Sequence, residues 1–169
     1  CTFTDASTSD YVVGLVVGQA GPAFYVLDLF REKTDVIGTM NMIARMHKRH
    51  QLDGTVIELA ASGYAVYQMA KKKVPGLIGF KPERSKEARA AGIVPVVEAG
   101  NVYLPISSPW LDNFVSEFSL FPASKNDDQV DALTMAVNYS LQRVAPQITE
   151  VTWGRGDRPL EGVRHLDIW

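Results

Sequence analysis

The sequence predicts an α/β domain with a mixed central β-sheet and helices on both of its faces. Three observations favour this fold class. The chain begins with a meander of three strand-like segments, at residues 1–8, 10–18 and 23–32. Helical segments then alternate with short apolar segments, an order typical of α/β folds. The chain also has 169 residues, 46% of them hydrophobic, which is enough apolar material for a single core.

The meander and the first helix follow from local composition. "YVVGLVVG" and "AFYVLDLFRE" are rich in β-branched and aromatic residues, and the turn-forming segments "DASTSD" and "QAGP" precede them. An amphipathic helix is expected over residues 34–51, with Thr34 or Asp35 as its cap. The side chains near helical spacing, which we expect on its apolar face, are Ile37, Met40, Ile43, Ala44 and Met46 or His47.

The remaining elements alternate along the chain. They are a strand at 53–60, a helix at 62–73, a strand at 77–82, a helix from residue 85, a strand at 101–105, and helices at 108–122 and 127–144. The strand at 53–60 is short and apolar, which is consistent with burial on both faces. The helix from residue 85 cannot extend past Val94, because Pro95 follows it. Since residues 146–169 show no sustained periodicity, we expect one domain at 1–145 and a tail or docking segment at 146–169.

Composition excludes several classes of protein. No apolar run approaches the roughly 20 residues of a membrane span, and no signal-peptide pattern opens the sequence. Cys1 is the only cysteine, which excludes an internal disulfide framework and fits a reducing compartment. The net charge of -2 argues against a generally basic surface for nucleic acid but allows a local basic patch. Strand-like sequence begins at once and without a methionine, so we expect an excised domain of a longer protein.

Motifs for several other chemistries are missing from the sequence. No Cys/His spacing indicates a zinc site, and neither the G-x-S-x-G motif nor the P-loop motif G-x-x-x-x-G-K-[ST] is found. His47 and His50, in "HKRH", are interpreted as an exposed helix end rather than as metal ligands.

Acidic residues stand at the edges of three predicted elements. Asp5 follows the apolar positions of the first strand, Glu58 lies inside "TVIELA", and Asp127, Asp128 and Asp131 mark the start of the last helix. Each place has a structural alternative, because aspartates cap turns and helices and a buried glutamate can be paired. An ionised glutamate in so apolar a strand is costly unless it is paired or bound to a metal. Glu58 is therefore the least ordinary of these acids.

Taken together, these acids indicate a metal site. Acids from two strands and a helix N-terminus can converge on one edge of a sheet, where ligands of such folds collect. Carboxylate oxygens suit Mg²⁺ or Mn²⁺. Two such ions about 3.5–4 Å apart cleave phosphodiesters, one by activating water and the other by stabilising the leaving oxygen.

Basic residues gather in "KPERSKEAR", which contributes Lys81, Arg84, Lys86 and Arg89. Lys86 and Arg89 stand at i and i+3 in the first turns of a helix, where a positive charge opposes the helix dipole. This placement favours contacts with DNA phosphates, which are independent of sequence and sensitive to salt. The "KKK" at 71–73 is interpreted as a helix end that complements the dipole.

Several segments, spread from about residue 3 to residue 140, resemble one protein family. They are "TDAS", "DYVVGLVVG", "YVLDLFRE", "VIELAASGYAVYQ", "KPERSKEARAAGIVPVVEAGNVYLP", "PWLDNFVSEFSLFP" and "NDDQVDAL". In their order and as a set they resemble the nuclease domain of the large terminase subunit of tailed bacteriophages. The resemblance implies a ribonuclease H-like fold and a two-metal nuclease site that uses Mg²⁺ or Mn²⁺.

The resemblance also implies roles for individual residues. Asp5 matches the first-strand aspartate of the family and would bridge both ions, while Glu58 and Asp128 would hold one each. Asp127 belongs to the same metal-binding pair of aspartates, and Lys86 and Arg89 fall where the family places basic residues. This sequence departs from the family in two places. "IELAASG" lacks the charged residues that often follow the second acid, and Asn126 stands where many relatives have histidine.

The family implies a function and a set of partners. We expect a metal-dependent endonuclease that cuts concatemeric double-stranded DNA during packaging, in the host cytoplasm and transiently at the procapsid portal. The implied protein partners are the terminase ATPase domain, the small terminase subunit and the portal. Two alternatives stay open: a Holliday-junction resolvase-like nuclease of the same fold, and a non-catalytic docking module whose acids only cap and pair.

The three aspartates of "NDDQVDAL" are predicted to differ in role. The buried stripe of the last helix is expected at Val130, Leu133, Val137 and Leu141. A helical wheel places Asp127 and Asp131 beside this stripe and Asp128 further round. The family resemblance instead favours Asp128 as the ligand, with Asp127 as cap and helper and Asp131 orienting a neighbouring basic residue.

Overall fold

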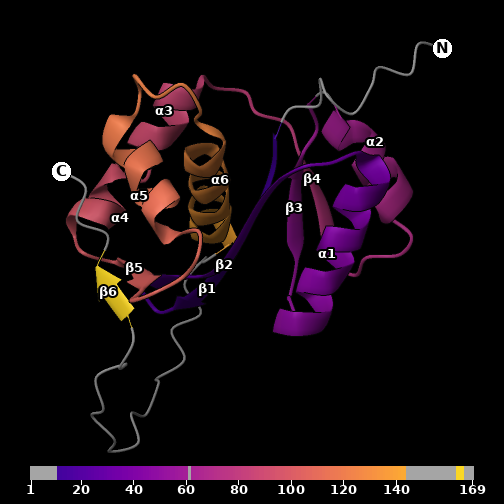
Figure 1. The fold of residues 1–169 in the computed structure, drawn as a ribbon, viewed down its shortest axis with the longest axis horizontal. Helices are drawn as coiled ribbons and strands as arrows, with labels where there is room; N and C mark the ends of the chain where they lie inside the picture. Colours follow the sequence, from indigo (N-terminus) through magenta and orange to yellow (C-terminus); the bar gives the residue numbers. More distant parts are fainter. Residues whose placement is uncertain (1–10, 61, 144–162, 166–169) are drawn as a thin grey trace, which may run out of the picture.

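The structure is a computed structural model, and it describes residues 11–60, 62–143 and 163–165. The predicted strand at 1–8, with Asp5, lies outside these residues, as does the predicted domain boundary at residue 145. In the described part, Figure 1 shows α3, α4, α5 and α6 on one side of a long β1–β2 hairpin and β3, β4, α1 and α2 on the other. None of the described helices combines the length and hydrophobicity that a membrane crossing requires.

The hairpin of β1 (Tyr11–Ala20) and β2 (Ala23–Lys33) confirms two strands of the predicted meander. Its antiparallel register runs from Tyr11 opposite Lys33 to Ala20 opposite Ala23, with an irregularity between Val16 and Val17. Gly21 has a φ of 57°, a left-handed conformation that glycine adopts without steric cost, so the chain reverses there. Both strands are slightly longer than the sequence predicts.

The hairpin belongs to a mixed four-stranded sheet in the order β1-β2-β5-β6. β5 (Val102–Pro105) is parallel to β2 and was predicted after Gly100. β6 (Val163–His165) is antiparallel to β5 and was not predicted. It lies inside the segment that we expected to be a tail, and three residues are too short to show a strand period.

A second, parallel sheet is formed by β3 (Thr55–Glu58) and β4 (Leu77–Phe80). The crossover between them contains α2 (Ser62–Ala70), which ends before the "KKK" segment that we expected to close it. The prediction that β3 is buried on both faces was wrong: all four of its residues are only partly buried. In the described part β3 pairs with β4 alone, which leaves its other edge uncovered.

The helix α1 (Val36–His50) begins as predicted, with the Asp35 carboxylate accepting a hydrogen bond from the Gly38 backbone N–H at 2.7 Å. Its buried face was predicted only in part: Ile43 is buried as expected, but Ile37 is exposed and Met42 is buried instead. Ala44 is exposed as well. The helix contacts β1 and α2, so its buried stripe is set by two neighbours that a single-helix pattern does not reveal.

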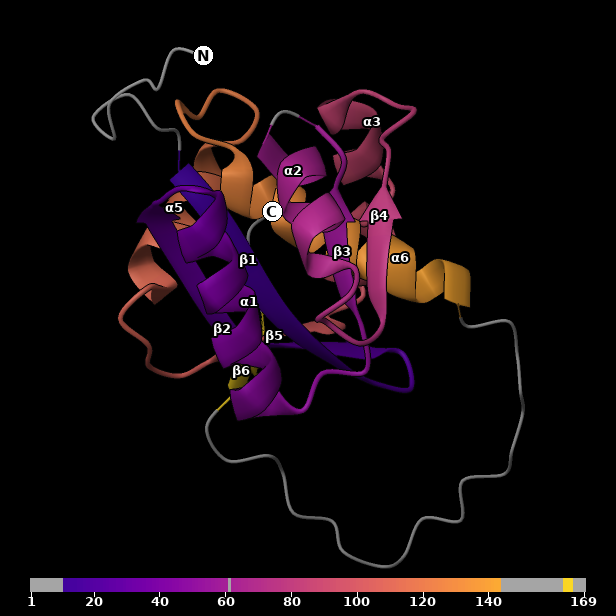
Figure 2. The ribbon, with the colours of Figure 1, turned by 90° about the vertical axis from the view of Figure 1, so that its right-hand side faces the viewer.

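The two histidines of α1 correct another prediction, because neither is an exposed helix end. His47 Nε2 lies 2.6 Å from Thr55 Oγ1, and His50 Nε2 lies 2.9 Å from Asp28 Oδ2. Both side chains therefore tie the last turns of α1 to β3 and β2. Figure 2 shows α1 and α2 on the viewer's side of the molecule, with α6 passing behind β3 and β4.

The four remaining helices are α3 (Lys86–Ala91), α4 (Val94–Glu98), α5 (Leu111–Leu120) and α6 (Asp128–Arg143). Ser85 caps α3, accepting a hydrogen bond from the Ala88 backbone N–H at 3.2 Å. α3 ends at Ala91, before Pro95. Pro95 occupies the first turn of α4, where its missing N–H is not needed, and α4 was not predicted. On α6, Leu141 is exposed, contrary to prediction, whereas Gln129 and Thr134 are buried.

These helices cover one face of the mixed sheet and form the core with it. Its fully buried side chains include Phe24, Val102, Leu104, Phe114, Leu133 and Val137. α6 also contacts β1, and Asp128, its first residue, lines the same groove as β1.

Candidate active site

The ends of three elements meet beside the uncovered edges of β1 and β3. Glu58 is the last residue of β3, Asp128 is the first of α6, and Lys86 is the first of α3. A groove of about 970 Å³ separates β1 from β3, and all three of these residues line it. Of the predicted acids in the described part, Glu58, Asp128 and Asp131 line this groove, whereas Asp127 does not.

Lys86 joins two of the aspartates. Its Nζ lies 2.7 Å from Asp127 Oδ1 and 2.8 Å from Asp131 Oδ2. Partial burial by itself lowers the pKa of Lys86, but the hydrogen bonds that Lys86 donates to both aspartates outweigh it and raise that pKa above its usual value. Lys86 is therefore charged at any physiological pH. Since 44% of its side chain is exposed, it also faces solvent.

Arg89 of α3 contacts acidic residues of both β3 and α6. Its Nη2 lies 2.9 Å from Asp131 Oδ1, and its Nη1 lies 3.8 Å from Glu58 Oε1. Only 11% of its side chain is exposed. The backbone carbonyl of Arg89 accepts a hydrogen bond from Asn138 Nδ2 at 3.1 Å, which fastens α3 to α6. Asp131 thus contacts both basic residues of α3.

Asp128 differs from its neighbours because it forms no ion pair within the described part of the chain. Burial, and then the nearby charges of Asp127 and Glu117, raise the pKa of Asp128 above its usual value. Its carboxylate lines the groove. An ionised carboxylate that is crowded by other acids and has no ion pair among the described residues is suited to receive a cation.

A residue that sequence reasoning missed holds the start of α6. Glu117, on α5, is only 6% exposed. Its Oε1 accepts hydrogen bonds from the backbone N–H groups of Gln129 at 2.6 Å and Val130 at 3.4 Å, and its Oε2 accepts one from Gln129 Nε2 at 2.5 Å. These contacts satisfy helix N-terminal donors that otherwise lack partners. The sequence signal was a glutamate beside Phe118 on the apolar side of a predicted helix.

The first turn of α2 lies directly against the end of β3. A Cβ atom added at Gly63 would lie 2.0 Å from the backbone oxygen of Glu58, so only glycine allows this approach. Leu59, the next residue, donates its backbone N–H to Phe80 O at 2.7 Å. The backbone around Glu58 is therefore held from two directions.

The other predicted basic residues do not join this cluster. Lys81 and Arg84 are exposed in the segment between β4 and α3, and neither forms an ion pair with a described residue. Lys86 and Arg89 contact acids rather than standing free. The role of all four toward DNA stays a prediction.

The residue types around the groove fit a hard divalent cation. Carboxylate oxygens are the ligands that Mg²⁺ and Mn²⁺ prefer, and Glu58, Asp127 and Asp128 supply them. Within residues 11–60, 62–143 and 163–165, no group of three potential ligands is already arranged around one point. Asp5, the predicted bridging ligand, lies outside these residues.

Comparison with known proteins identifies a family. The model of a family described as the terminase RNaseH-like domain matches residues 1–140. No curated protein and no solved structure matches the chain. The match spans every predicted site residue, from Asp5 to Asp131.

Proposed function

Because the chain belongs to the family of terminase RNaseH-like domains, which are nuclease-type domains, we propose that it is a metal-dependent endonuclease that cuts concatemeric double-stranded DNA. The observation that carries this proposal is the convergence of Glu58 and Asp128 on one groove, beside a lysine and an arginine. Carboxylates next to fixed positive charges are what a site for hydrolysing phosphodiesters requires.

The groove also offers a place for Asp5. Within the described residues, β1 is the last strand of its sheet and β3 pairs only with β4, so both have an uncovered edge. A two-stranded sheet is marginal by itself. Figure 1 shows β1 beginning and β3 ending at the same end of the molecule, and we propose that Asp5 contributes a metal ligand at this end, beside Glu58.

The residues would then divide the chemistry between them. Asp5, Glu58 and Asp128, helped by Asp127, would hold two Mg²⁺ or Mn²⁺ ions, which supply an activated water and stabilise the leaving oxygen. Since only 11% of the Arg89 side chain is exposed and it contacts both acids, we propose that it positions Glu58 and Asp131. Lys86, with Lys81 and Arg84, would contact DNA phosphates, since 44% of its side chain is exposed. In the family setting, the terminase ATPase domain, small subunit and portal would deliver this DNA.

The test is plasmid cleavage by the chain in Mg²⁺, Mn²⁺ and EDTA. We expect cutting with either ion and none in EDTA, and a loss of at least about 100-fold for Asp5→Asn, Glu58→Gln and Asp128→Asn, because each removes a ligand charge. Asp112→Asn, an exposed acid on α5, is the matched control and should cut normally. Cleavage in EDTA, or normal cleavage by Asp128→Asn, would contradict the proposal.

The same assay separates the three aspartates. We expect Asp128→Ala to abolish single-turnover nicking in Mn²⁺, and Asp127→Ala to reduce it. Asp131→Ala should mainly lower stability, because Asp131 pairs with Lys86 and Arg89. If Asp127→Ala were inactive and Asp128→Ala active, Asp127 would be the principal ligand.

A further inference from the structure

Two basic side chains at the end of β2 gather around one aromatic ring of β1. Arg31 and Lys33 are separated by one residue, and side chains alternate along a strand, so both lie on the same face of the sheet. Tyr11 stands opposite Lys33 in the register and lines the groove. Arg31 Cζ lies 4.1 Å and Lys33 Nζ 5.3 Å from the centre of the Tyr11 ring. The ring therefore holds two cations at the side of the groove.

Asn113 of α5 connects Arg31 to the start of α6. Its Oδ1 accepts hydrogen bonds from Arg31 Nη1 at 3.4 Å and from Gln129 Nε2 at 2.9 Å. Gln129 follows Asp128 directly in the sequence. The charge of Arg31 also reaches the groove, because it opposes the rise in the pKa of Asp128 that burial causes. Arg31 is thus held near the candidate metal ligand of α6.

Arg31 differs from Lys86 and Arg89 in its partners. Both of those residues form ion pairs with acids, whereas Arg31 forms none with a described residue. Its contact with Asn113 is its one hydrogen bond in the described part, and its Nε is buried, which leaves the Nη atoms to meet a ligand. A partly buried guanidinium group with unused donors is suited to phosphate, which it can bind through paired hydrogen bonds.

The acidic groove requires such unpaired cations if it is to receive DNA. The acids that line it near the start of α6 are Glu58, Asp128 and Asp131. The cations beside them, Lys86 and Arg89, are already paired with acids. Since carboxylates repel the phosphate backbone, unpaired positive charge at the side of the groove would hold the backbone close to the acids.

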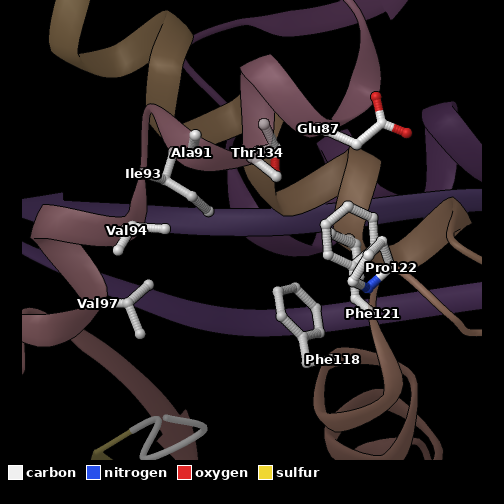
Figure 3. Close-up of a pocket in the computed structure, with 11 residues that line it drawn as sticks. Glu87, Ala91, Ile93, Val94, Val97, Phe118, Phe121, Pro122 and Thr134 are labelled. Atoms are coloured by element: carbon white, nitrogen blue, oxygen red, sulfur yellow. The ribbon is translucent and has the colours of Figure 1, made fainter.

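A second cavity, among α3, α4, α5 and α6, does not suit phosphate. Its volume is about 220 Å³, and its walls are almost entirely apolar. Figure 3 shows Val94 and Val97 on one side of it and Phe118 and Phe121 on the other. Glu87, the one ionisable residue among its described lining residues, carries a negative charge. A phosphate would lose its water there and meet no cation.

We propose that Arg31 and Lys33 bind backbone phosphates of the DNA that lies in the groove, with the Tyr11 ring holding Arg31 in place. This site rests on the proposed function, which makes DNA the ligand. Arg31 would bind one phosphate through its Nη atoms, and the exposed Lys33 would act as a point charge on a neighbouring phosphate. Because phosphate contacts carry no base information, both residues would position DNA of any sequence relative to Asp128.

The first test measures binding of a labelled DNA duplex to the full chain in EDTA, by fluorescence anisotropy over a range of salt concentrations. We expect Arg31→Gln to raise Kd at least about fivefold and Lys33→Gln about twofold to threefold. Each should make the slope of log K against log salt shallower by about 0.9, the value for one lost phosphate contact. Arg45→Gln, an exposed arginine of α1, is the matched control and should behave as wild type.

The conservative variant separates a phosphate contact from a structural role. Arg31→Lys keeps the charge but loses the paired hydrogen bonds, so it should keep the wild-type salt slope and recover only part of the affinity. A slope for Arg31→Lys equal to that of Arg31→Gln would show that the residue acts through structure. That result would overturn the proposal. So would wild-type affinity and slope for Arg31→Gln, or no DNA binding by the wild-type chain.

The second test separates this site from the nuclease activity. In Mn²⁺, Arg31→Gln should raise KM for plasmid cleavage by about the factor found for Kd and leave kcat within about twofold, because the contact is made equally before and during the reaction. A lower kcat with unchanged KM would overturn the proposal, since Arg31 would then act on Asp128 rather than on DNA. If DNA binding depends on Arg31 as expected but the wild-type chain cuts with no ion, the proposed function fails and the phosphate site stands.

Discussion

Asp128 differs from the other acids of the groove because it forms no ion pair with any described residue. Lys86 and Arg89 neutralise Asp127 and Asp131, and Arg89 also approaches Glu58. For Asp128, burial and the like charges of Asp127 and Glu117 outweigh the positive charges of Lys86 and Arg31, which is why its pKa is raised. In the absence of a metal ion, this carboxylate should therefore oppose folding when it is ionised.

This expectation can be measured with Asp128→Asn in EDTA. The pKa of Asp128 is higher in the folded state, so its contribution to stability is fully present below the unfolded pKa of about 3.9 and is lost as pH rises through the folded pKa. At pH 7 the variant lacks this penalty, so it should melt a few degrees above wild type. The difference between the two melting temperatures should disappear toward pH 3.

The control for this prediction is Asp112→Asn, whose melting temperature should follow wild type at both pH values because Asp112 is exposed. A variant Asp128→Asn that melts below wild type at pH 7 would show that ionised Asp128 is stabilised by contacts at the start of α6. The helix dipole would be the physical source of such stabilisation.

The candidate residues could be predicted from sequence only where their chemistry was unusual for their position. A glutamate in an apolar strand and three aspartates at a helix start indicated the groove, and Lys86 and Arg89 opposed the dipole of their own helix. His50 and Asp28 gave no such signal, because their contact joins residues 22 positions apart. Pairing across such a distance depends on packing that a local pattern does not contain.

Among the elements, α6 depends on a neighbour for its start. A helix N-terminus has backbone N–H groups without internal partners, and here the buried Glu117 carboxylate accepts two of them. Glu117 also accepts a hydrogen bond from the side-chain amide of Gln129. The position of Asp128, the first residue of α6, therefore depends on α5.

Glu117→Ala should lower the free energy of unfolding by about 2–3 kcal/mol, because hydrogen bonds to a buried charged group are lost and their donors stay unpaired. Glu117→Gln keeps one carbonyl acceptor for the backbone, so its loss should be clearly smaller. Urea denaturation measures both, with the exposed Glu98→Ala as the control. Equal losses for alanine and glutamine would mean that the cap contributes through packing rather than through hydrogen bonds.

Short elements were the part of the fold that local patterns did not predict. The long strands β1 and β2 and the helices α1 and α6 were found because several periods of alternation or helical spacing are visible in them. α4 has five residues and β6 has three, which is less than two helical turns or two strand periods. β6 forms because it pairs with the edge of β5, and this edge results from the assembly of the sheet rather than from the local sequence.

At the scale of the whole molecule, the groove and the helical core are separate structures that share α6. Its apolar side, with Leu133 and Val137, is buried in the core, and its first turn presents Asp128 to the groove. β1 takes part in both, since it pairs with β2 and lines the groove. A ligand bound among β3, α3 and α6 would therefore join parts of the chain that the sheets do not connect.

This arrangement predicts that divalent ions stabilise the whole domain. An ion that binds only the folded site adds RT ln(1 + [L]/Kd), about 2.7 kcal/mol at a concentration of 100 Kd, and a domain of this size gains about 2–4 °C per kcal/mol. Mg²⁺ and Mn²⁺ should raise the melting temperature of wild type and of Asp112→Asn equally. The rise in melting temperature should be much smaller for Asp128→Asn, because Asp128 forms no ion pair with Lys86 or Arg89. Ca²⁺, which tolerates looser geometry, should stabilise the domain yet support little cleavage. If Asp128→Asn were stabilised as much as wild type, the ions would be binding outside the groove, and the metal site would have to be sought elsewhere.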